Sequence, residues 1–339
     1  MNSISSPLVS VLTPVCNGAV HLAECIESVL AQTYPYWDYT IVNNCSTDDS
    51  LRIAQEYAAR DPRIRVLNND RLLSTVESHN HLVRQASPES KYCKIVFAED
   101  WTYPTCIEEM VRVAEQHPSV GLVGAYTMDG RAVLWHGPPH PTNPVTGQEV
   151  CRGILLGGPF VLGSMTSLLV RSDLVRKQAR FFDEQNPHRE IAACFEVLRE
   201  SDYGYVHQVL SFSRPRERSA ELIARTLHTC MLGSVVVCLK YGPVFLNSAE
   251  HRRRWKRLRW DYHRVLAMSW IRRRPKQFWE FHKETLEAFG GRIDRGLLTA
   301  CVIFELASRL SRPLHSAKDA WRAWSRARAE IHQEISVSR

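Results

Sequence analysis

The stretch KIVFAEDWTYP, residues 94–104, carries an apolar run that ends on the acidic pair Glu99–Asp100. Residues Tyr92 to Phe97 have the length and apolar content of a buried strand, and Pro104 is typical of the first turn of a helix. The stretch therefore predicts one strand-to-helix unit with two carboxylates at its junction. These carboxylates either hold a metal ion over a substrate or only solvate the end of the strand.

The same alternation of strand and helix recurs on both sides of this stretch. Short apolar runs predict strands, and apolar residues at helical spacing predict the helices between them. Repeated units of this kind predict a parallel sheet with helices on both faces. The predicted strands are Val9–Leu12, Tyr39–Val42, Ile64–Leu67, Tyr92–Phe97 and Gly121–Tyr126. The predicted helices are Val20–Leu30, a helix capped within Ser46–Asp49 that runs to Ala59, Val76–Gln85, and Pro104–Gln116.

The remainder of the chain divides into an irregular part and a helical part. Residues 130–160 are rich in Gly, Pro and His and predict a long loop or an irregular hairpin. Strand patterns return at Met165–Val170 and Tyr205–Leu210, around a helix at Arg189–Glu200. Beyond residue 220 the pattern is helical, with breaks near Gly242–Pro243, Pro275, Gly290–Gly291 and Pro313. We therefore expect an α/β domain over residues 1–220 and a basic, mostly helical region over residues 221–339.

Charge and cysteine usage support this division and a cytoplasmic location. Residues 1–220 contain 20 Lys and Arg against 25 Asp and Glu, whereas the remainder contains 23 against 11. The ten cysteines form no CxxC pair, so free thiols in a reducing compartment are expected. The start MNSISSPLVSV does not resemble a signal peptide. The longest apolar stretches, near 228–239 and 297–308, are shorter than the roughly 20 residues of a spanning helix.

Ligands of parallel α/β sheets bind beyond the carboxyl ends of the strands. Here those ends are Thr13–Asn17, Asn43–Ser46 and Ala98–Trp101. A dinucleotide-binding fold would show GxGxxG after the first strand, but TPVCNG stands there, and the phosphate-loop pattern GxxxxGK[ST] is absent. Mg²⁺ or Mn²⁺ typically bridges one or two carboxylates to substrate phosphates. The acidic pair is therefore a candidate site for a metal that assists a diphosphate leaving group.

Three segments, VSVLTPVCNG, HLAECIESVLAQTYPYWDYTIVNNCSTDDS and KIVFAEDWTYPTCIEEMV, resemble the family 2 glycosyltransferases of the GT-A fold. The resemblance covers about residues 7–220 and continues through GSMTSLLVRSDLV, FFDEQNPHREIAACFEVL and DYGYVHQVLSFSR. It implies a Rossmann-like mixed, mostly parallel sheet with helices on both faces, followed by the C-terminal helical region. It also implies an inverting, metal-dependent enzyme of bacterial polysaccharide biosynthesis. Such enzymes transfer a sugar from a nucleotide sugar, commonly a UDP-sugar, to a glycan or lipid-linked glycan hydroxyl.

The resemblance also implies a nucleotide site on the first two strand ends. The turn containing Thr13, Pro14 and Asn17 corresponds to the family's TPxYN turn, with Cys16 in place of the usual tyrosine. Asn44 stands where many members have an aspartate that reads uracil, and its amide offers both a donor and an acceptor. Ser46, in the same loop, is included in the predicted nucleotide site.

The catalytic and metal-binding residues follow in the same way. Asp100 corresponds to the carboxylate that contacts Mn²⁺ or Mg²⁺, and Glu99 replaces a usual aspartate beside the nucleotide. Arg214 is expected to reach the diphosphate, and Arg216 stands where some relatives have a histidine. Within HREIAACFEVL, Glu190 corresponds to the general base, although a helix-starting glutamate also interacts favourably with the helix dipole.

Four of these positions depart from common residues of the family: Cys16, Glu99, Glu190 and Arg216. Because the polar character of these positions is mostly kept, we expect an active enzyme. The alternative is a catalytically inactive member that binds a glycan or a partner protein. The sequence does not identify the donor sugar, the acceptor, the linkage or the oligomeric state.

The segment 251–276, HRRRWKRLRWDYHRVLAMSWIRRRPK, contains eleven Lys and Arg with one Asp and four interleaved aromatic residues. An amphipathic helix on anionic lipid has this composition, which would place the protein on the inner face of the cytoplasmic membrane. A solvated or self-associating helix is an equally good interpretation. Nucleic-acid binding is not expected, because no recognition fold accompanies the segment.

Overall fold

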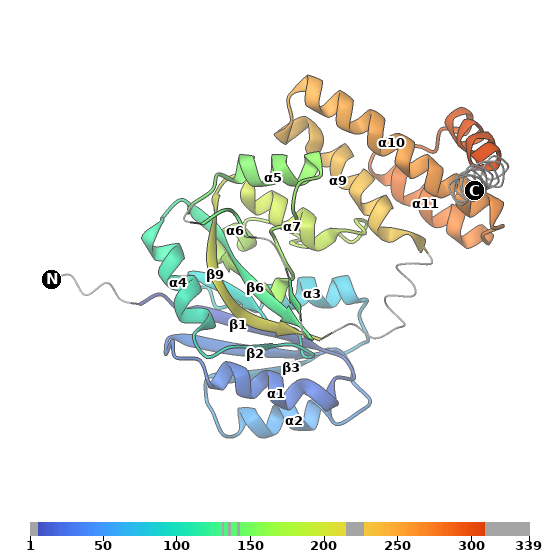
Figure 1. Cartoon of the computed structure of the whole chain (residues 1–339). Coiled ribbons are helices and arrows are strands. Elements are labelled where there is room, and N and C mark those ends of the chain that lie inside the picture. The colour runs from blue at the N-terminus through green and yellow to red at the C-terminus, as the bar shows by residue number, and fades with distance from the viewer. Residues whose placement is uncertain (1–5, 131, 135–136, 141–142, 215–226, 309–339) are drawn as a thin grey trace, which may run out of the picture. The chain divides into compact units, whose positions relative to one another are not determined.

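The computed structural model describes residues 6–130, 132–134, 137–140, 143–214 and 227–308 (Figure 1). Within them the strands are β1 (Val9–Val15), β2 (Trp37–Asn43), β3 (Ile64–Asn68), β4 (Tyr92–Ile95), β5 (Trp101–Thr102), β6 (Val120–Asp129), β7 (Ala132–Leu134), β8 (Leu168–Arg171) and β9 (Asp202–Ser213). The helices are α1 (Ala19–Leu30), α2 (Ser50–Ala58), α3 (Thr75–Val83), α4 (Cys106–Gln116), α5 (Gly147–Leu156), α6 (Ser172–Arg176), α7 (Arg189–Leu198), α9 (Thr229–Phe245), α10 (Ser248–Ile271) and α11 (Lys276–Ala288). A 3₁₀ turn, η1 (Met165–Ser167), precedes β8.

The strands form one mixed sheet in the order β3-β2-β1-β4-β8-β6-β9-β5, with β7 paired to β6. The pairs β1–β2, β1–β4, β2–β3 and β6–β9 are parallel. Antiparallel pairing places β8 between β4 and β6, and adds β5 to β9 and β7 to β6. The predicted mixed, mostly parallel sheet is therefore confirmed, and the βα units at residues 9–116 lie where the sequence predicts them.

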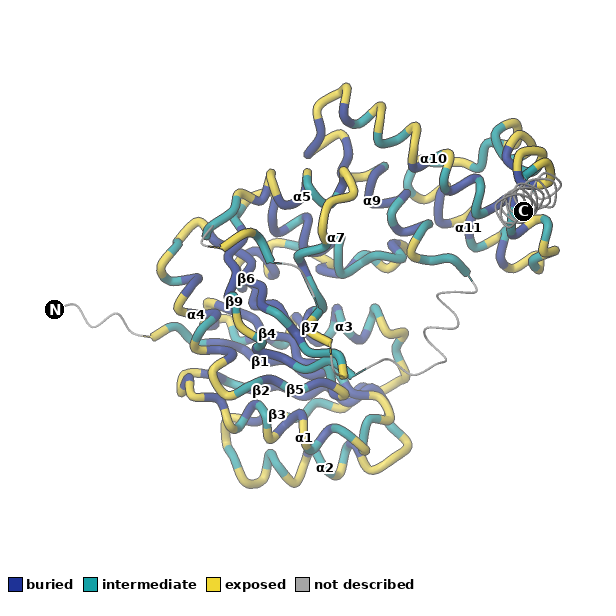
Figure 2. Tube along the Cα trace, viewed as in Figure 1, coloured by how far each residue is buried: buried dark blue, intermediate teal, exposed yellow. Residues whose placement is uncertain are grey.

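Helices cover both faces of the sheet, as predicted. On β1, Val9, Val11 and Val15 belong to a buried cluster with residues of α1, α2 and α4, whereas the equally buried Leu12 lies outside that cluster. This alternation is that of a strand with two covered faces. On the other face α3 packs against β1 and β2, and α7 packs against β6. Figure 2 shows the buried strands between exposed helix surfaces.

Two local expectations need correction. Residues 130–160 contain the helix α5 in addition to the hairpin strand β7. The Thr146 hydroxyl accepts a 3.2 Å hydrogen bond from the Glu149 amide at its start, and Gly157 ends it with φ of +91°. The break predicted near Gly242–Pro243 falls inside α9, which continues to Phe245. The break predicted at Pro313 lies outside the described residues.

The chain packs as two units, Met1–Arg254 and Trp255–Arg339. The first contains the sheet and the helices α1 to α9. The second contains most of α10, all of α11 and the helical residues 295–308. The domain boundary at residue 220 stays a prediction, since residues 215–226 lie outside the described ranges. No helix among the described residues is both long and apolar enough to cross a membrane.

Candidate functional site

The strand ends predicted to bind a ligand lie on the same edge of the sheet. Because β2, β1 and β4 are adjacent and parallel, their carboxyl ends and the loops that follow them meet there. The Asn44 amide donates a 2.8 Å hydrogen bond to the Val15 carbonyl, which ties the first two loops together. The end of β9 reaches the loop after β4, where the Arg214 amide bonds Asp100. The structure therefore brings most of the predicted site residues to one edge.

The Asp100 carboxylate, at this edge, accepts hydrogen bonds from distant segments of the chain. Its Oδ2 accepts hydrogen bonds from the Thr166 hydroxyl at 2.6 Å and from the Ser213 hydroxyl at 3.2 Å. Its Oδ1 accepts the Arg214 backbone amide at 3.1 Å. The residue is only 7% exposed, so at least these three protein donors surround a buried carboxylate. Asp100 thus joins the end of β4 to η1 and to the end of β9.

Glu99 has the opposite environment. Its side chain is exposed, and its carboxylate has no hydrogen bond or ion pair within the described part of the chain. The acidic pair is therefore divided between one carboxylate engaged by the protein and one that faces solvent. The role of Asp100 as metal ligand stays a prediction, and Glu99 is the carboxylate with room for an incoming cation.

The strand β4, which precedes this acidic pair, carries a buried lysine that was not among the predicted site residues. Lys94 of β4 is fully buried, and its ammonium group donates to the carbonyls of Thr166 and, at 3.1 Å, Leu168. Burial lowers the pKa of Lys94, while the Cys106 side chain and the charge of Asp100 act in the opposite direction. Lys94 thereby anchors the turn whose Thr166 hydroxyl holds Asp100. Its signal in the sequence is a cation inside an otherwise apolar strand.

The loops after β1 and β2 form a second polar group at the edge. The Asn17 amide oxygen accepts from the Thr47 amide at 2.7 Å, and the Asn17 backbone amide donates to the Ser46 hydroxyl at 2.9 Å. Asn17 adopts a left-handed conformation with φ of +55°, which asparagine tolerates better than most residues. Asn17 and Cys16 are exposed, and Pro14 and Ser46 are half-buried. These residues are accessible to a ligand.

Thr13 and Asn44 are less accessible. The Thr13 hydroxyl is fully buried, donates to the Val96 carbonyl at 2.7 Å and lies 2.9 Å from the Tyr39 hydroxyl. It therefore has no free group to offer a nucleoside. The Asn44 side chain is buried and forms a clamp on the loop after β3, where it donates to the Leu73 carbonyl and accepts from the Leu73 amide, both at 2.9 Å. In this structure the Asn44 side chain therefore holds the loop after β3 at the sheet edge.

Arg214 extends from the end of β9 toward α1. Its guanidinium forms an ion pair with Glu24, and it lies 5.6 Å from the centre of the Phe212 ring. The pair is partly exposed, since the two side chains are 28% and 52% accessible. Such a pair is weak and exchangeable, so the guanidinium remains a candidate for the diphosphate. Arg216 lies outside the described residues.

Glu190 lies in the first turn of α7, where its charge faces the positive end of the helix dipole and adds to burial in raising the pKa of Cys194. The loop before α7 is tied to α3, because the Asn80 side chain exchanges two 2.8 Å hydrogen bonds with the backbone of Phe182. The His79 ring lies 5.4 Å from Phe97 and 5.7 Å from Phe182. Helix α3 therefore connects the loop of Glu190 to the segment that carries the acidic pair.

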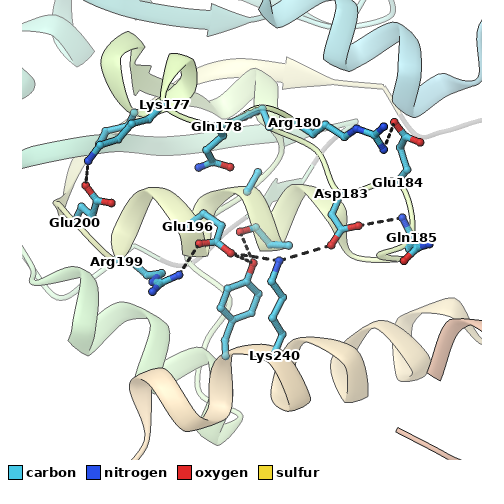
Figure 3. Close-up of a pocket in the computed structure, with 15 residues that line it drawn as sticks. Lys177, Gln178, Arg180, Asp183, Glu184, Gln185, Glu196, Arg199, Glu200 and Lys240 are labelled. Carbon is cyan, nitrogen blue, oxygen red and sulfur yellow. Dashed lines mark hydrogen bonds and ion pairs between the residues drawn. The ribbon is translucent and has the colours of Figure 1, made fainter. Parts of the chain in front are cut away.

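A polar groove of about 570 Å³ lies on a different surface of α7 (Figure 3). Figure 3 shows Lys240 between Asp183 and Glu196, at 3.6 and 3.3 Å, and the Tyr241 hydroxyl donates to Glu196 at 2.9 Å. The tyrosine, Arg199 and Lys240 lower the pKa of Glu196 against the opposing effect of burial. None of the predicted site residues lines this groove, and its charged side chains largely pair with one another. We do not assign it to the reaction.

The residues at the sheet edge fit a cation that is completed by substrate. Among the described residues no cluster of three or more His, Cys, Asp and Glu could enclose a metal ion. Mg²⁺ and Mn²⁺ in phosphate chemistry commonly take one or two protein carboxylates and complete their shell with phosphate oxygens and water. Glu99 meets this requirement as a solvent-facing carboxylate beside Asp100.

Comparisons with known proteins show which sequences and folds this chain is similar to. Residues 10–174 match the family described as Glycosyl transferase family 2. The glycosyltransferase GlyG of Streptococcus pneumoniae is 25% identical over 283 residues, which are 77% of this chain and 89% of that protein. EpsE of Bacillus subtilis, whose name describes it provisionally as a glycosyltransferase, is 31% identical over 160 residues, 45% of this chain and 56% of that protein. The chain thus spans about half the length of EpsE and most of GlyG.

Solved structures share the fold. TarS of S. aureus with bound UDP-GlcNAc matches with a TM-score of 0.60 and 16% identity, over 83% of this chain and 80% of that chain. The mannosyltransferase PcManGT of Pyrobaculum calidifontis, solved with GDP-Man and Mn²⁺, matches with a TM-score of 0.54 and 14% identity, over 92% and 83%. At these identities the likeness shows the architecture alone, and it confirms the predicted GT-A fold.

Proposed function

We propose that this chain, whose residues 10–174 match glycosyl transferase family 2, transfers a sugar from a nucleotide sugar to a glycan hydroxyl. The observation that carries the proposal is the meeting of polar strand ends at one edge of the sheet, with the Glu190 loop tied to that edge through α3. A UDP-sugar is the donor that we favour, since TarS, which shares the fold, was solved with UDP-GlcNAc. The acceptor would be a glycan or lipid-linked glycan of polysaccharide biosynthesis.

The transfer would be a single displacement with inversion. The Glu190 carboxylate removes the proton of the acceptor hydroxyl, and the oxygen attacks the anomeric carbon while the bond to the diphosphate breaks on the opposite side. Glu190 lies in the first turn of α7, at the end of the helix where the dipole attracts negative charge. A charged carboxylate is the form that accepts a proton.

Departure of the nucleoside diphosphate needs positive charge at the sheet edge. Glu99, with Asp100 beside it, would hold a divalent cation, Mn²⁺ or Mg²⁺, which neutralises negative charge on the diphosphate when bound. Arg214 would exchange its partner Glu24 for a phosphate oxygen, because guanidinium groups bind phosphate in two-point geometry. Asn17, Ser46 and the neighbouring Pro14 would seat the nucleoside.

The proposal also includes a location. A transferase of lipid-linked glycans would work in the cytoplasm, at the inner face of the cytoplasmic membrane. The basic region beyond residue 250 supports this location through its charge.

A panel of nucleotide sugars, with and without Mn²⁺, tests the reaction through donor hydrolysis and transfer to an acceptor extract. We expect Glu190→Gln to lower turnover by about 10²–10⁴-fold, because the amide cannot accept the proton. Glu200→Gln is the matched control, since this exposed carboxylate lies just beyond the same helix and pairs with Lys177. Turnover that is equal in wild type and Glu190→Gln would contradict the assignment of the base.

The second candidate is a binding protein without turnover. It is favoured by the replacement of common family residues at Cys16, Glu99, Glu190 and Arg216. Calorimetric binding of UDP, together with no turnover of any donor in the panel, would support this function over the enzyme.

A further inference from the structure

Residues 255–308 expose an unusual amount of apolar surface. Among the described residues eleven large apolar side chains are exposed, and five of these eleven lie within residues 255–308. They are Trp260 (36% exposed), Trp270 (57%), Ile303 (62%), Phe304 (46%) and Leu306 (44%). Single exposed apolar residues are ordinary on protein surfaces, but a group of this kind is typical of an interaction site.

These side chains are neighbours in pairs. The rings of Trp260 and Phe304 lie 5.8 Å apart, edge to face. Trp270 and Leu306 line one groove of about 510 Å³, together with Trp279 and the arginines at the end of α10. Exposed apolar residues of α10 thus meet those of residues 303–306 at two places. We call these exposed residues together the apolar face: Trp260, Trp270, Ile303, Phe304 and Leu306.

Positive charge borders the apolar face. Residues 255–276 contain eight Lys and Arg against the single acid Asp261. Four of the basic residues have acidic partners, namely Arg257, Arg259, Arg264 and Lys276. Lys256, Arg272 and Arg273 are exposed and have no ion pair within the described ranges. These three cations remain available to an anionic partner.

The arginines at the end of α10 are presented by an ordered turn. The Arg272 amide donates to the Met268 carbonyl at 3.0 Å, and the Arg274 amide donates to the Ser269 carbonyl at 3.0 Å. Arg273 closes the helix in the left-handed conformation, with φ of +54°, where glycine is the usual residue. A non-glycine residue in this conformation is strained, and here it places a cation beside the groove that Trp270 lines.

We propose that the apolar face and its arginine border form a docking surface for an anionic lipid bilayer. Tryptophan, phenylalanine and aliphatic side chains beside arginines match the boundary between lipid headgroups and acyl chains. Each basic residue near such a surface adds to the electrostatic attraction. A second copy of this chain would bring two positive borders together, so the charge selects an anionic partner. The aliphatic residues Ile303 and Leu306 favour lipid over nucleic acid.

This surface differs from the one that composition alone suggested. Tyr262, one of the interleaved aromatic residues, is buried, with its hydroxyl 2.7 Å from His282 Nδ1. Ile303, Phe304 and Leu306 lie outside the basic segment but complete the surface. The docking surface rests on the membrane location included in the proposed function but not on the transferase reaction. Loss of flotation with retained transfer would therefore overturn the docking surface alone.

Flotation of the full chain with vesicles tests the docking surface. The vesicles are phosphatidylcholine alone, and phosphatidylcholine mixed with phosphatidylglycerol. We expect wild type to float with the anionic vesicles only. Trp270→Ser with Leu306→Ser should weaken binding about tenfold or more through lost apolar burial. Arg272→Gln with Lys256→Gln should weaken it by about tenfold or more through lost charge.

Matched controls come from the first unit, where Val133→Ser removes an exposed apolar side chain and Arg112→Gln removes an exposed cation. Both controls should float like wild type, and circular dichroism should show native helix content in every variant. Absence of flotation with either vesicle would overturn the proposal, as would flotation that the four substitutions leave unchanged. A dimer in light scattering that Trp270→Ser with Leu306→Ser dissociates would instead assign the face to self-association.

Discussion

At the scale of single residues, Glu99 and Asp100 show how adjacent carboxylates acquire different roles. The loop turns between them, so Asp100 points into three protein donors while Glu99 faces solvent. Several hydrogen bonds to one carboxylate fix its orientation. Asp100 is therefore suited to positioning the end of β4 against η1 and β9. Glu99 remains accessible to a cation from solvent.

Substitution of Thr166 tests how much its hydrogen bond to Asp100 contributes to stability. Thr166→Val removes the donor to Asp100 and the acceptor of the Phe97 amide. We expect the free energy of unfolding to fall by about 1.5–3 kcal/mol, the value of a hydrogen bond to a charged group. Chemical denaturation measures this change. Thr33→Val is the control, because its hydroxyl donates to the exposed carboxylate of Glu108, and it should cost no more than about 0.5 kcal/mol. Equal losses in the two variants would contradict a special role for the buried bond.

At the scale of helices and strands, the sequence predicted what local periodicity controls. Val9, Val11 and Val15 alternate as a strand must, and Leu22, Ile26 and Val29 recur at helical spacing, so β1 and α1 were found. Helix α5 was missed because flanking glycines and prolines hid a short helix, although Thr146 and Glu149 formed a capping signal.

The hydrogen-bond partners and the accessibility of the site residues depend on long-range packing, which the sequence does not predict. Nothing near Asp100 in the chain indicates that Thr166 and Ser213 will supply its donors. The burial of Thr13 against Tyr39 is equally a property of the assembled sheet. Candidate residues of the site were thus visible as residue types, whereas their accessibility depended on segments distant in the sequence.

The start of α7 makes stability depend on pH through His188. Its ring packs against Gly233 of α9, where an added Cβ would lie 2.4 Å from the ring. Burial lowers the pKa of His188 below the ordinary value of about 6.5. As the pH falls below that value, the unfolded chain takes up a proton that the folded protein resists, so stability decreases. We expect unfolding free energies measured from pH 7 to pH 5 to fall less steeply in His188→Gln than in wild type. Identical slopes would show that this histidine does not contribute.

At the scale of the whole molecule, the two units differ in charge and in content. The predicted nucleotide and metal residues all lie in Met1–Arg254, as does the sheet. The second unit has a buried core of its own, with Leu258, Leu266, Phe278, Leu286 and Cys301. A region with its own core can unfold as a separate cooperative unit. A ligand that binds one unit should then stabilise that unit alone.

Differential scanning calorimetry with UDP and Mn²⁺ tests this separation. At a UDP concentration about 100 times its dissociation constant, binding adds about 2.7 kcal/mol to the stability of the unit that binds. For a unit of this size that gain raises its unfolding midpoint by about 5–10 °C. We expect the transition of the first unit to rise and that of the second to stay fixed.

Glu99→Gln, or removal of Mn²⁺ with EDTA, should reduce this rise in the unfolding midpoint, because the cation links the carboxylate to the diphosphate. A single transition that rises as a whole would show that the units unfold together, and the absence of any rise would contradict UDP binding in the proposed function.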